Sequence, residues 1–153
     1  MPKPITGGCL CGAVRYEADQ PPNEVYACHC RYCQRYTGSA FWAGAKFPEG
    51  ALRFIAGAPS SHRATPLLER YFCTDCGSSI GLRYIKAPWP EYEPGMEVGL
   101  GSLDDPTAFE PAYHFCVESK LAWPQFDKAI PLLRGDEDEG LASAFDEASQ
   151  ADN

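Results

Sequence analysis

Seven of the eight cysteines fall into three short clusters, and this spacing constrains the chain more than any other feature. The clusters are Cys9-Leu-Cys11, Cys28-His-Cys30-Arg-Tyr-Cys33 and Cys73-Thr-Asp-Cys76. Thiolates at such short spacings converge on a soft metal ion, and zinc is the usual occupant. Four of these cysteines would complete one tetrahedral site, which leaves three. A zinc ion with three protein ligands keeps one coordination position for a substrate.

Length and charge indicate one domain followed by an acidic tail. The chain has 153 residues and a formal net charge of −8. The segment after Arg134 contains seven acidic residues and neither lysine nor arginine: Asp136, Glu137, Asp138, Glu139, Asp146, Glu147 and Asp152. We therefore predict a single zinc-binding β domain over residues 1–134. The tail, 135–153, is predicted to be flexible or to form a weak exposed helix.

Composition also limits the partners and the compartment. Lysine and arginine do not cluster as they do on a nucleic-acid-binding surface, and no apolar run is long enough to span a membrane. The N-terminal residues contain no apolar run typical of a signal peptide. We expect a cytoplasmic protein, in which clustered cysteines are metal ligands or catalysts. The alternative is a secreted disulfide scaffold, which a Cys-x-Cys pair suits poorly.

Short apolar and aromatic runs between turn residues predict a mainly β fold. Fourteen glycines and fourteen prolines favour turns over long helices. The expected strands are Ala13–Ala18, Glu24–Ala27, Ala40–Phe47, Leu52–Ala56, Leu68–Phe72, Ser79–Tyr84, Glu97–Leu100 and His114–Val117. One short helix is expected directly after the central cysteine trio, from Arg31 to Tyr36, with Gly38 as a left-handed cap.

The glycines suggest how the cysteines divide between two sites. Cys11 and Cys76 are each followed by a glycine, as in a zinc knuckle, where a residue without Cβ lets backbone N–H groups point at sulfur. We assign Cys9, Cys11, Cys73 and Cys76 to a structural zinc. The trio Cys28, Cys30 and Cys33 runs instead into the expected helix, whose N-terminus favours thiolate.

The trio is therefore the candidate catalytic site, with Cys28, Cys30 and Cys33 as ligands of a second zinc. Several other interpretations are open from spacing alone. His29 or His114 could complete a closed site with no chemistry. The trio could hold an iron–sulfur cluster, or Cys30 and Cys33 could form a free redox dithiol.

Other residues have less specific interpretations. Arg31, Arg35 and Lys46 are candidates to hold the carboxylates of a thiol ligand, or they are ordinary surface charges. Cys116 is expected to be a small buried side chain on a strand, His114 a structural imidazole and His62 a loop residue. Aromatic side chains flank the clusters and are expected in the core first and in pocket walls second: Phe41, Trp42, Phe47, Tyr71, Phe72 and Trp123.

These motifs together resemble the glutathione-dependent formaldehyde-activating enzyme family, which includes the centromere protein V-like proteins. The resemblance rests on Gly8-Cys9-x-Cys11-Gly12, Cys28-His-Cys30-x-x-Cys33-Gln-Arg-x-Thr-Gly and Phe72-Cys73-x-x-Cys76-Gly77. The residues Pro111, His114, Lys120, Trp123, Asp127 and Pro131 are similar to the C-terminal signature of that family. The resemblance covers about residues 7–133.

The resemblance implies a zinc-containing β-tent fold of short antiparallel sheets with two zinc ions. It implies a structural zinc on the two knuckles, a catalytic zinc on the trio, and a carbon–sulfur lyase activity that condenses glutathione with formaldehyde or reverses this. One departure is Phe115-Cys116, where members of the family often carry an aliphatic residue and a tryptophan. The expected partners are a small thiol and an aldehyde, with no nucleic acid and no membrane. The alternative function is a non-catalytic two-zinc module that binds a protein partner.

Overall fold

The computed structural model describes residues 3–125 and 131–151, and it is mainly β. Asp127 of the C-terminal signature and Asp152 of the tail lie outside these residues. The described strands are β1 (Ile5–Gly8), β2 (Arg15–Ala18), β3 (Glu24–Cys28), β4 (Trp42–Pro48), β5 (Leu52–Ala56), β6 (Ser60–His62), β7 (Leu68–Phe72), β8 (Ser79–Tyr84), β9 (Gly95–Gly99) and β10 (Tyr113–Phe115). The helical segments are α1 (Arg31–Thr37), η1 (Leu100–Ser102), η2 (Val117–Ser119) and α2 (Glu139–Ala151).

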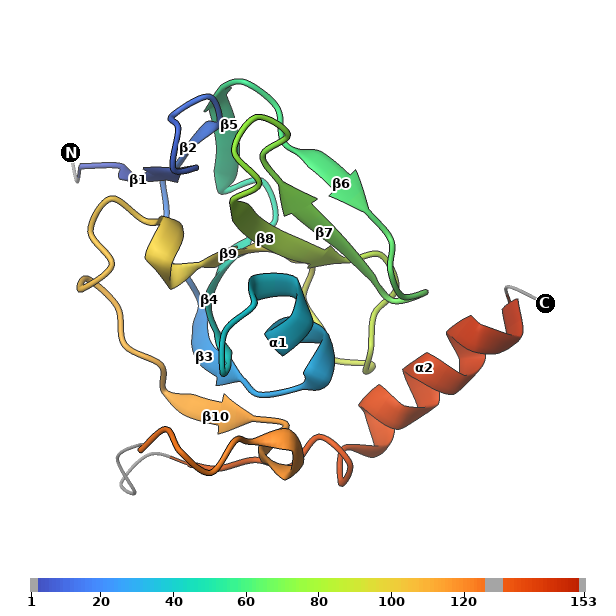
Figure 1. Ribbon diagram of the computed structural model, residues 1–153. Coiled ribbons are helices and arrows are strands. Elements are labelled where there is room, and N and C mark those ends of the chain that lie inside the picture. Colours follow the sequence, from blue (N-terminus) through green and yellow to red (C-terminus); the bar gives the residue numbers. More distant parts are fainter. Residues whose placement is uncertain (1–2, 126–130, 152–153) are drawn as a thin grey trace.

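The strands form two sheets. The smaller sheet has the order β1-β2-β5, and the larger has the order β10-β3-β4-β9-β8-β7-β6. The strand pairs are antiparallel except for β10, which lies parallel to β3. Figure 1 shows the larger sheet curving around α1, with β10 below the helix and the smaller sheet at the top. The mainly β prediction, with one short helix directly after the cysteine trio, is confirmed.

The predicted strand boundaries differ from the observed ones by at most two residues. The sequence pattern missed β1 and β6, which are short and polar. His62 was expected in a loop but lies in β6, because antiparallel pairing sets it opposite Arg70 of β7. The last expected strand was predicted to reach Val117 but ends at Phe115, because Cys116 has a left-handed backbone with φ of 56°.

Two apolar clusters fill the interior. One contains Tyr16, Phe47, Ile80 and Val98 and joins the two sheets. The other contains Tyr26, Trp42, Leu68 and Leu82, together with Cys28, Cys33 and Cys116. Trp42 and Phe47 are therefore core residues, as expected. The prediction was wrong for Trp123, which is 73% exposed because it follows η2 in an irregular surface segment.

Helix α1 is held in place at both ends and along its buried face. Its N-cap is Cys30, whose Sγ accepts a hydrogen bond from the backbone N–H of Cys33 at 3.3 Å. Its C-cap is Gly38, with φ of 68°, which only a residue without Cβ adopts at little cost. The buried amide of Gln34 donates to the carbonyls of His29 and Ser119 at 2.8 and 3.0 Å. The helix therefore fixes Cys30 and Cys33 relative to the sheet.

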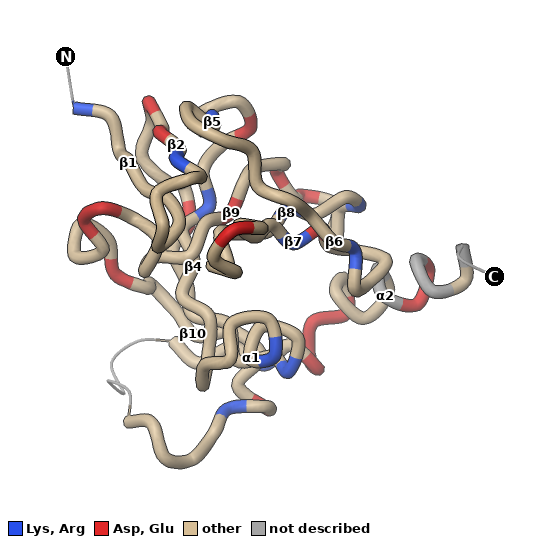
Figure 2. The backbone as a smooth tube through the Cα atoms, turned by 45° about the horizontal axis from the view of Figure 1, so that its top comes forward, with Lys and Arg blue, Asp and Glu red and all other residues tan. Residues whose placement is uncertain are grey.

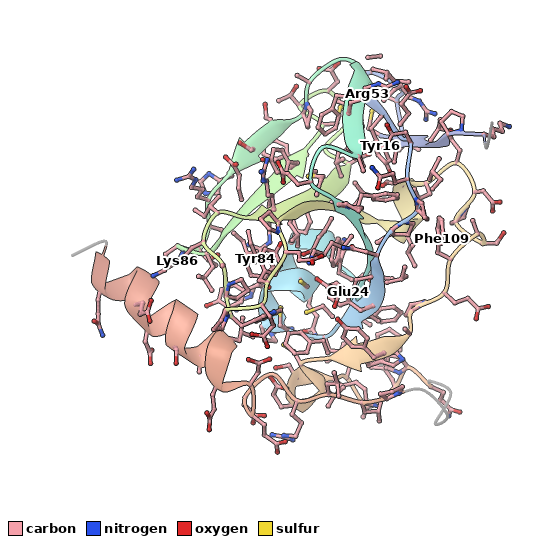
Figure 3. The ribbon with its side chains drawn as sticks, turned by 180° about the vertical axis from the view of Figure 1, so that it is seen from behind. Tyr16, Glu24, Arg53, Tyr84, Lys86 and Phe109 are labelled. Carbon is pink, nitrogen blue, oxygen red and sulfur yellow. The ribbon has the colours of Figure 1, made fainter. Side chains whose placement is uncertain are left out.

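The acidic tail is helical in part and returns to the body of the protein. Figure 2 shows acidic residues on the segment that leads into α2. Leu141, in the first turn of α2, packs against the core cluster that contains Cys28 and Cys33. Lys86 lies beside α2 in Figure 3, and its Nζ is 3.0 Å from Glu147 Oε2. Neither this helix nor any other in the described part of the chain is long and apolar enough to cross a membrane.

Candidate metal sites and active site

The two knuckles converge on one four-cysteine cluster, defined here as Cys9, Cys11, Cys73 and Cys76. The four sulfurs all lie within 4.8 Å of one another. The sulfurs of Cys9 and Cys11 are 3.5 Å apart, and those of Cys11 and Cys73 are 3.8 Å apart. Tetrahedral zinc with Zn–S bonds of about 2.3 Å separates its sulfurs by about 3.8 Å. The cluster therefore fits a zinc ion.

Local turns position these sulfurs. Gly12 and Gly77, which follow the second cysteine of each knuckle, have φ of 80° and 75°. The backbone N–H of Val14 donates to Cys9 Sγ at 3.2 Å, and Ser78 Oγ lies 3.1 Å from Cys76 Sγ. The hydroxyl of Ser78 lowers the pKa of Cys76 to about 6, which favours the thiolate that binds metal. Since one knuckle follows β1 and the other follows β7, a metal ion here would tie the two sheets together.

The remaining trio forms a three-cysteine cluster, defined as Cys28, Cys30 and Cys33. Its sulfurs also lie within 4.8 Å of one another, so the donor set fits zinc as well. Cys28 ends β3, Cys30 caps α1 and Cys33 lies in the first turn of that helix. Cys28 and Cys33 are buried, whereas Cys30 is only partly covered. Cys30 is therefore the member that a ligand can reach.

No imidazole joins this cluster among the described residues. The side chain of His29 is fully buried, and its Nε2 lies 2.8 Å from Nδ1 of His114. Burial lowers the pKa of His29 to about 4, so this imidazole is neutral at pH 7. Pairing of β10 with β3 brings the two histidines together away from the three sulfurs. The geometry therefore gives no support to a closed site of three cysteines and one histidine.

Cys116 lies closer to the trio than its sequence position indicates. Its thiol interacts with the thiols of Cys28 and Cys30, yet it is not among the sulfurs that all lie within 4.8 Å of one another. Cys116 is the one described residue other than glycine with a positive φ. It is buried, as expected, but it follows β10 instead of lying in a strand. In the sequence, only the departure from the family pattern at Phe115-Cys116 indicated that Cys116 lies near the trio.

The interactions among these thiols single out Cys30. Hydrogen bonds from the thiols of Cys116, Cys28 and Cys33 lower the pKa of Cys30 well below its ordinary value. In the same network, hydrogen bonding with Cys116 and Cys30 raises the pKa of Cys28. Hydrogen bonding among these thiols therefore favours a negative charge at the three-cysteine cluster.

A cavity of about 360 Å³, called here the thiol cavity, adjoins the three-cysteine cluster. Tyr84, which lies towards the middle of the molecule in Figure 3, lines both this cavity and a smaller one around Glu97, as do Tyr26 and Phe115. The walls of the thiol cavity come from β3, α1, β7, β8 and β10, from residues between β10 and α2, and from the first turn of α2. They include Tyr26, Cys28, Cys30, Arg31, Tyr32, Cys33, Leu68, Arg70, Leu82, Tyr84, Phe115, Cys116, Glu118, Ser119, Gly135, Asp136, Leu141 and Ala142.

The predicted carboxylate-binding residues do not all reach this cavity. Arg31 lines it, and Arg35 lines a neighbouring hollow of about 400 Å³. Lys46 is not among the lining residues of either space, because antiparallel pairing of β3 with β4 sets it opposite Glu24. Its Nζ is 3.7 Å from Glu24 Oε2 and lies 4.2 Å from the centre of the Tyr92 ring.

Sequence reasoning missed Arg70, which lines both the thiol cavity and the neighbouring hollow. The signal was present in the alternation of β7. Leu68, Arg70 and Phe72 share one face of that strand, so Arg70 occupies a position at which an apolar residue is normal. A buried cation on the apolar face of a strand marks a functional candidate.

The chain is similar to a known family, to a curated protein and to a solved structure. A family model described as glutathione-dependent formaldehyde-activating enzyme matches residues 4–119. A curated protein of Halomonas elongata, provisionally named as a glutathione-dependent formaldehyde-activating enzyme, is 28% identical over 131 residues, covering 80% of this chain and 81% of that protein. A crystal structure of a Rhodobacter sphaeroides protein has a TM-score of 0.52 and 21% identity, and the match covers 83% of this chain and 98% of that one.

The family match spans all seven clustered cysteines and Cys116 but ends before Lys120 and Trp123 of the expected C-terminal signature. The Rhodobacter structure supports the fold alone at its level of identity. Since the family model matches most of the sequence, this chain belongs to the glutathione-dependent formaldehyde-activating enzyme family.

Proposed function

We propose that the protein is a zinc-dependent enzyme of the carbon–sulfur lyase type. It joins a glutathione-like thiol to a small aldehyde such as formaldehyde, or it reverses that reaction. The observation that carries the proposal is a cluster of three close sulfurs that borders a cavity and has no fourth donor at the same spacing among the described residues. Membership of the family supports a thiol and an aldehyde as substrates.

In this proposal the four-cysteine cluster holds a structural zinc and the three-cysteine cluster holds a catalytic zinc. Zinc bound by three thiolates supplies a position at which a substrate thiol is kept as thiolate near neutral pH. The walls formed by Leu68, Leu82 and Tyr84 exclude water from the buried side of the thiol cavity. Arg31 in the thiol cavity and Arg35 in the neighbouring hollow add positive charge where an anionic thiol would enter.

The bond changes of the proposed reaction are simple. The thiolate sulfur attacks the carbonyl carbon, and a carbon–sulfur bond forms. The electron pair of the carbonyl π bond moves to oxygen, which takes up a proton from water to give a hemithioacetal. The proton that the substrate thiol released neutralises the hydroxide that is left. In the reverse direction the hydroxyl loses its proton, the carbon–sulfur bond breaks and the aldehyde leaves the cavity.

A non-catalytic module with two structural zinc ions is the rival function. It requires a permanent fourth donor at the three-cysteine cluster, and Cys116 is the nearest candidate, because its thiol interacts with those of Cys28 and Cys30. The two functions therefore differ in what Cys116 does. In the enzyme, Cys116 does not bind the metal, and the fourth coordination position stays exchangeable. In the module, Cys116 occupies that position permanently.

Cobalt substitution followed by thiol titration tests the proposal. We expect the d–d absorption of the cobalt-loaded wild type to change on addition of glutathione, and the Cys116→Ser variant to keep two metal ions per chain and the same response. The Cys30→Ser variant should lose the response while its circular dichroism stays unchanged. A wild-type spectrum that ignores glutathione, or a Cys116→Ser variant that loses one metal equivalent, would favour the non-catalytic module.

Two further parts of the proposal concern the chain as a whole. We place the catalytic domain at residues 1–134, with 135–153 as a tail whose helix α2 touches the thiol cavity through Leu141 and Ala142. We also place the protein in the cytoplasm, where a reducing environment keeps the clustered thiols available for metal.

A further inference from the structure

Arg70 is a buried arginine in the middle of β7. Its backbone pairs with His62 of β6 on one side and with Leu82 of β8 on the other. The residue is 5% exposed, and the neighbouring positions on its face of the strands, Leu68 and Leu82, are apolar. A guanidinium group cannot lose its proton in a protein, so this site buries a full positive charge.

The guanidinium of Arg70 makes no hydrogen bond with any described residue, although Glu118 and Asp136 line the same cavity. Its Nε, Nη1 and Nη2 atoms are all buried and make no hydrogen bond with any described residue, cysteine sulfurs included. The nearest favourable contact is with the ring of Tyr36, whose centre lies 5.7 Å from the guanidinium carbon. Burying a cation without a hydrogen-bond acceptor is costly, so Arg70 lowers the stability of the fold.

The position of Arg70 connects it to the proposed chemistry. The thiol cavity, which holds the three-cysteine cluster, and the neighbouring hollow of about 400 Å³ share Arg70 and Tyr32 in their walls. A molecule whose sulfur reaches Cys30 would therefore occupy a cavity whose wall includes Arg70. Arg31 is less suited to the same task, since it is exposed and already donates to the side chain of Gln34.

We infer that Arg70 binds a carboxylate carried by the thiol substrate. This inference rests on the proposed function and specifies its substrate class. The thiol substrate is an anion, and the residue that binds its carboxylate is Arg70 of β7, in the wall of the thiol cavity. The planar fork of a guanidinium matches a carboxylate with two parallel hydrogen bonds, which a lysine cannot reproduce. The buried site strengthens those bonds, because little water competes for them.

A matched pair of small thiols tests the inference. The probes are 3-mercaptopropionate and 3-mercaptopropanol, which have the same number of non-hydrogen atoms in the chain between sulfur and the terminal carbon but differ in charge. Their affinities are measured from the absorption of the full-length cobalt-loaded protein. The variants are Arg70→Met and Arg70→Lys. The control is Arg83→Gln, which alters an exposed arginine of β8 that pairs with Glu49 at 2.6 Å.

We expect the wild type to bind the carboxylate probe at least about 10-fold more tightly than the alcohol, as charge-assisted hydrogen bonds predict. Arg70→Met should remove this preference without changing the affinity for the alcohol, Arg70→Lys should keep part of it, and Arg83→Gln should keep all of it. Arg70→Met should also unfold at no lower temperature than the wild type, because it removes a buried charge without a hydrogen-bond partner.

The outcomes separate the inference from the proposed function. A wild type that binds both probes equally well, or an Arg70→Met variant that keeps the preference, overturns the role of Arg70 alone. A wild type whose spectrum ignores both probes overturns the proposed function together with the inference. If Arg70→Met does not fold, Arg70→Lys decides: an undiminished preference in that variant contradicts bidentate binding.

Discussion

The two cysteine clusters differ in the number of their sulfurs and in the surroundings of those sulfurs. The four-cysteine cluster lies in two turns, and a metal ion bound by its four sulfurs would join the two sheets. The three-cysteine cluster lies at the junction of β3 and α1, beside a cavity whose far wall carries a buried arginine. A full set of donors suits a metal ion that stabilises the fold, whereas an incomplete set beside a cavity suits chemistry. The comparison teaches that the number of donors and their surroundings, rather than the residue type, distinguish the candidate structural site from the candidate active site.

The surroundings differ in a second respect. At the four-cysteine cluster the nearby polar groups, such as the N–H of Val14 and the hydroxyl of Ser78, already contact sulfur. Beside the three-cysteine cluster, the guanidinium of Arg70 has no hydrogen-bond partner among the described residues. Polar groups that all have hydrogen-bond partners are typical of a structural site. A buried polar group without such a partner indicates a site that a ligand completes.

The largest expected effect separates the two clusters by their contribution to stability. Cys73→Ser should lower the free energy of unfolding by several kcal/mol, comparable with the entire stability of a small domain of about 5–15 kcal/mol, because binding of a structural metal is coupled to folding. Cys30→Ser should leave the unfolding transition nearly unchanged and abolish only the response to thiols. Urea denaturation followed by circular dichroism, with metal content measured in parallel, checks both variants. Equal destabilisation by the two substitutions would remove the distinction between the clusters.

The second effect concerns a buried carboxyl on the side of the thiol cavity. Burial raises the pKa of the Glu97 carboxyl from 4.5 to about 7. A hydrogen bond from the hydroxyl of Tyr26 lowers this pKa, while the charge of Glu24 raises it and that of Lys46 lowers it. Because the folded pKa lies above the unfolded one, Glu97 stabilises the fold fully below about pH 4.5. That contribution disappears as the pH rises through 7, a change worth about 3 kcal/mol.

Glu97→Gln tests this expectation, since glutamine imitates the neutral carboxyl. The wild type should lose stability relative to the variant between pH 5.5 and pH 8, measured as the difference in urea-unfolding free energy with both proteins saturated with zinc. Taking the difference cancels the pH dependence of metal binding, which acts on both proteins. A difference that stays constant over this range would show that Glu97 is ionised throughout.

The smallest effect belongs to a surface carboxylate on the side of the four-cysteine cluster. Arg15 donates to both carboxylate oxygens of Asp104 and, with Thr6, lowers the pKa of Asp104 to about 2. The depressed pKa means that this stabilisation is present above about pH 4 and is lost as the pH falls towards 2. The side chains are 31% and 47% exposed, so solvent screens the pair. Asp104→Asn should therefore cost at most about 1 kcal/mol at pH 7.

The measurement for Asp104→Asn is thermal unfolding at low and at high salt. The cost should shrink in 0.5 M sodium chloride, because ions screen an exposed pair. A cost that is large and independent of salt would mean that Asp104 supports the neighbouring turn rather than the ion pair. That result would place more of the fold's stability outside the metal site on this side of the molecule.

The sequence by itself determined the parts of this protein that depend on neighbouring residues. The glycines after Cys11 and Cys76 indicated zinc knuckles, and both have a positive φ in the structure. The run from Cys30 to Gly38 predicted a short capped helix. Short apolar and aromatic runs between turn residues predicted most strands within two residues. These features follow from local sterics and hydrogen bonding, so a short stretch of sequence contains all the information that they need.

Only the tertiary structure decided which distant residues share the thiol cavity. Parallel pairing of β10 with β3 brings Cys116 to the trio and turns His29 and His114 towards each other. Pairing of β7 with β8 places Arg70 in the wall of the thiol cavity, and pairing of β3 with β4 takes Lys46 to Glu24 instead. The register between strands far apart in the chain sets these contacts. It is determined by burial of the whole apolar surface, which no local motif specifies.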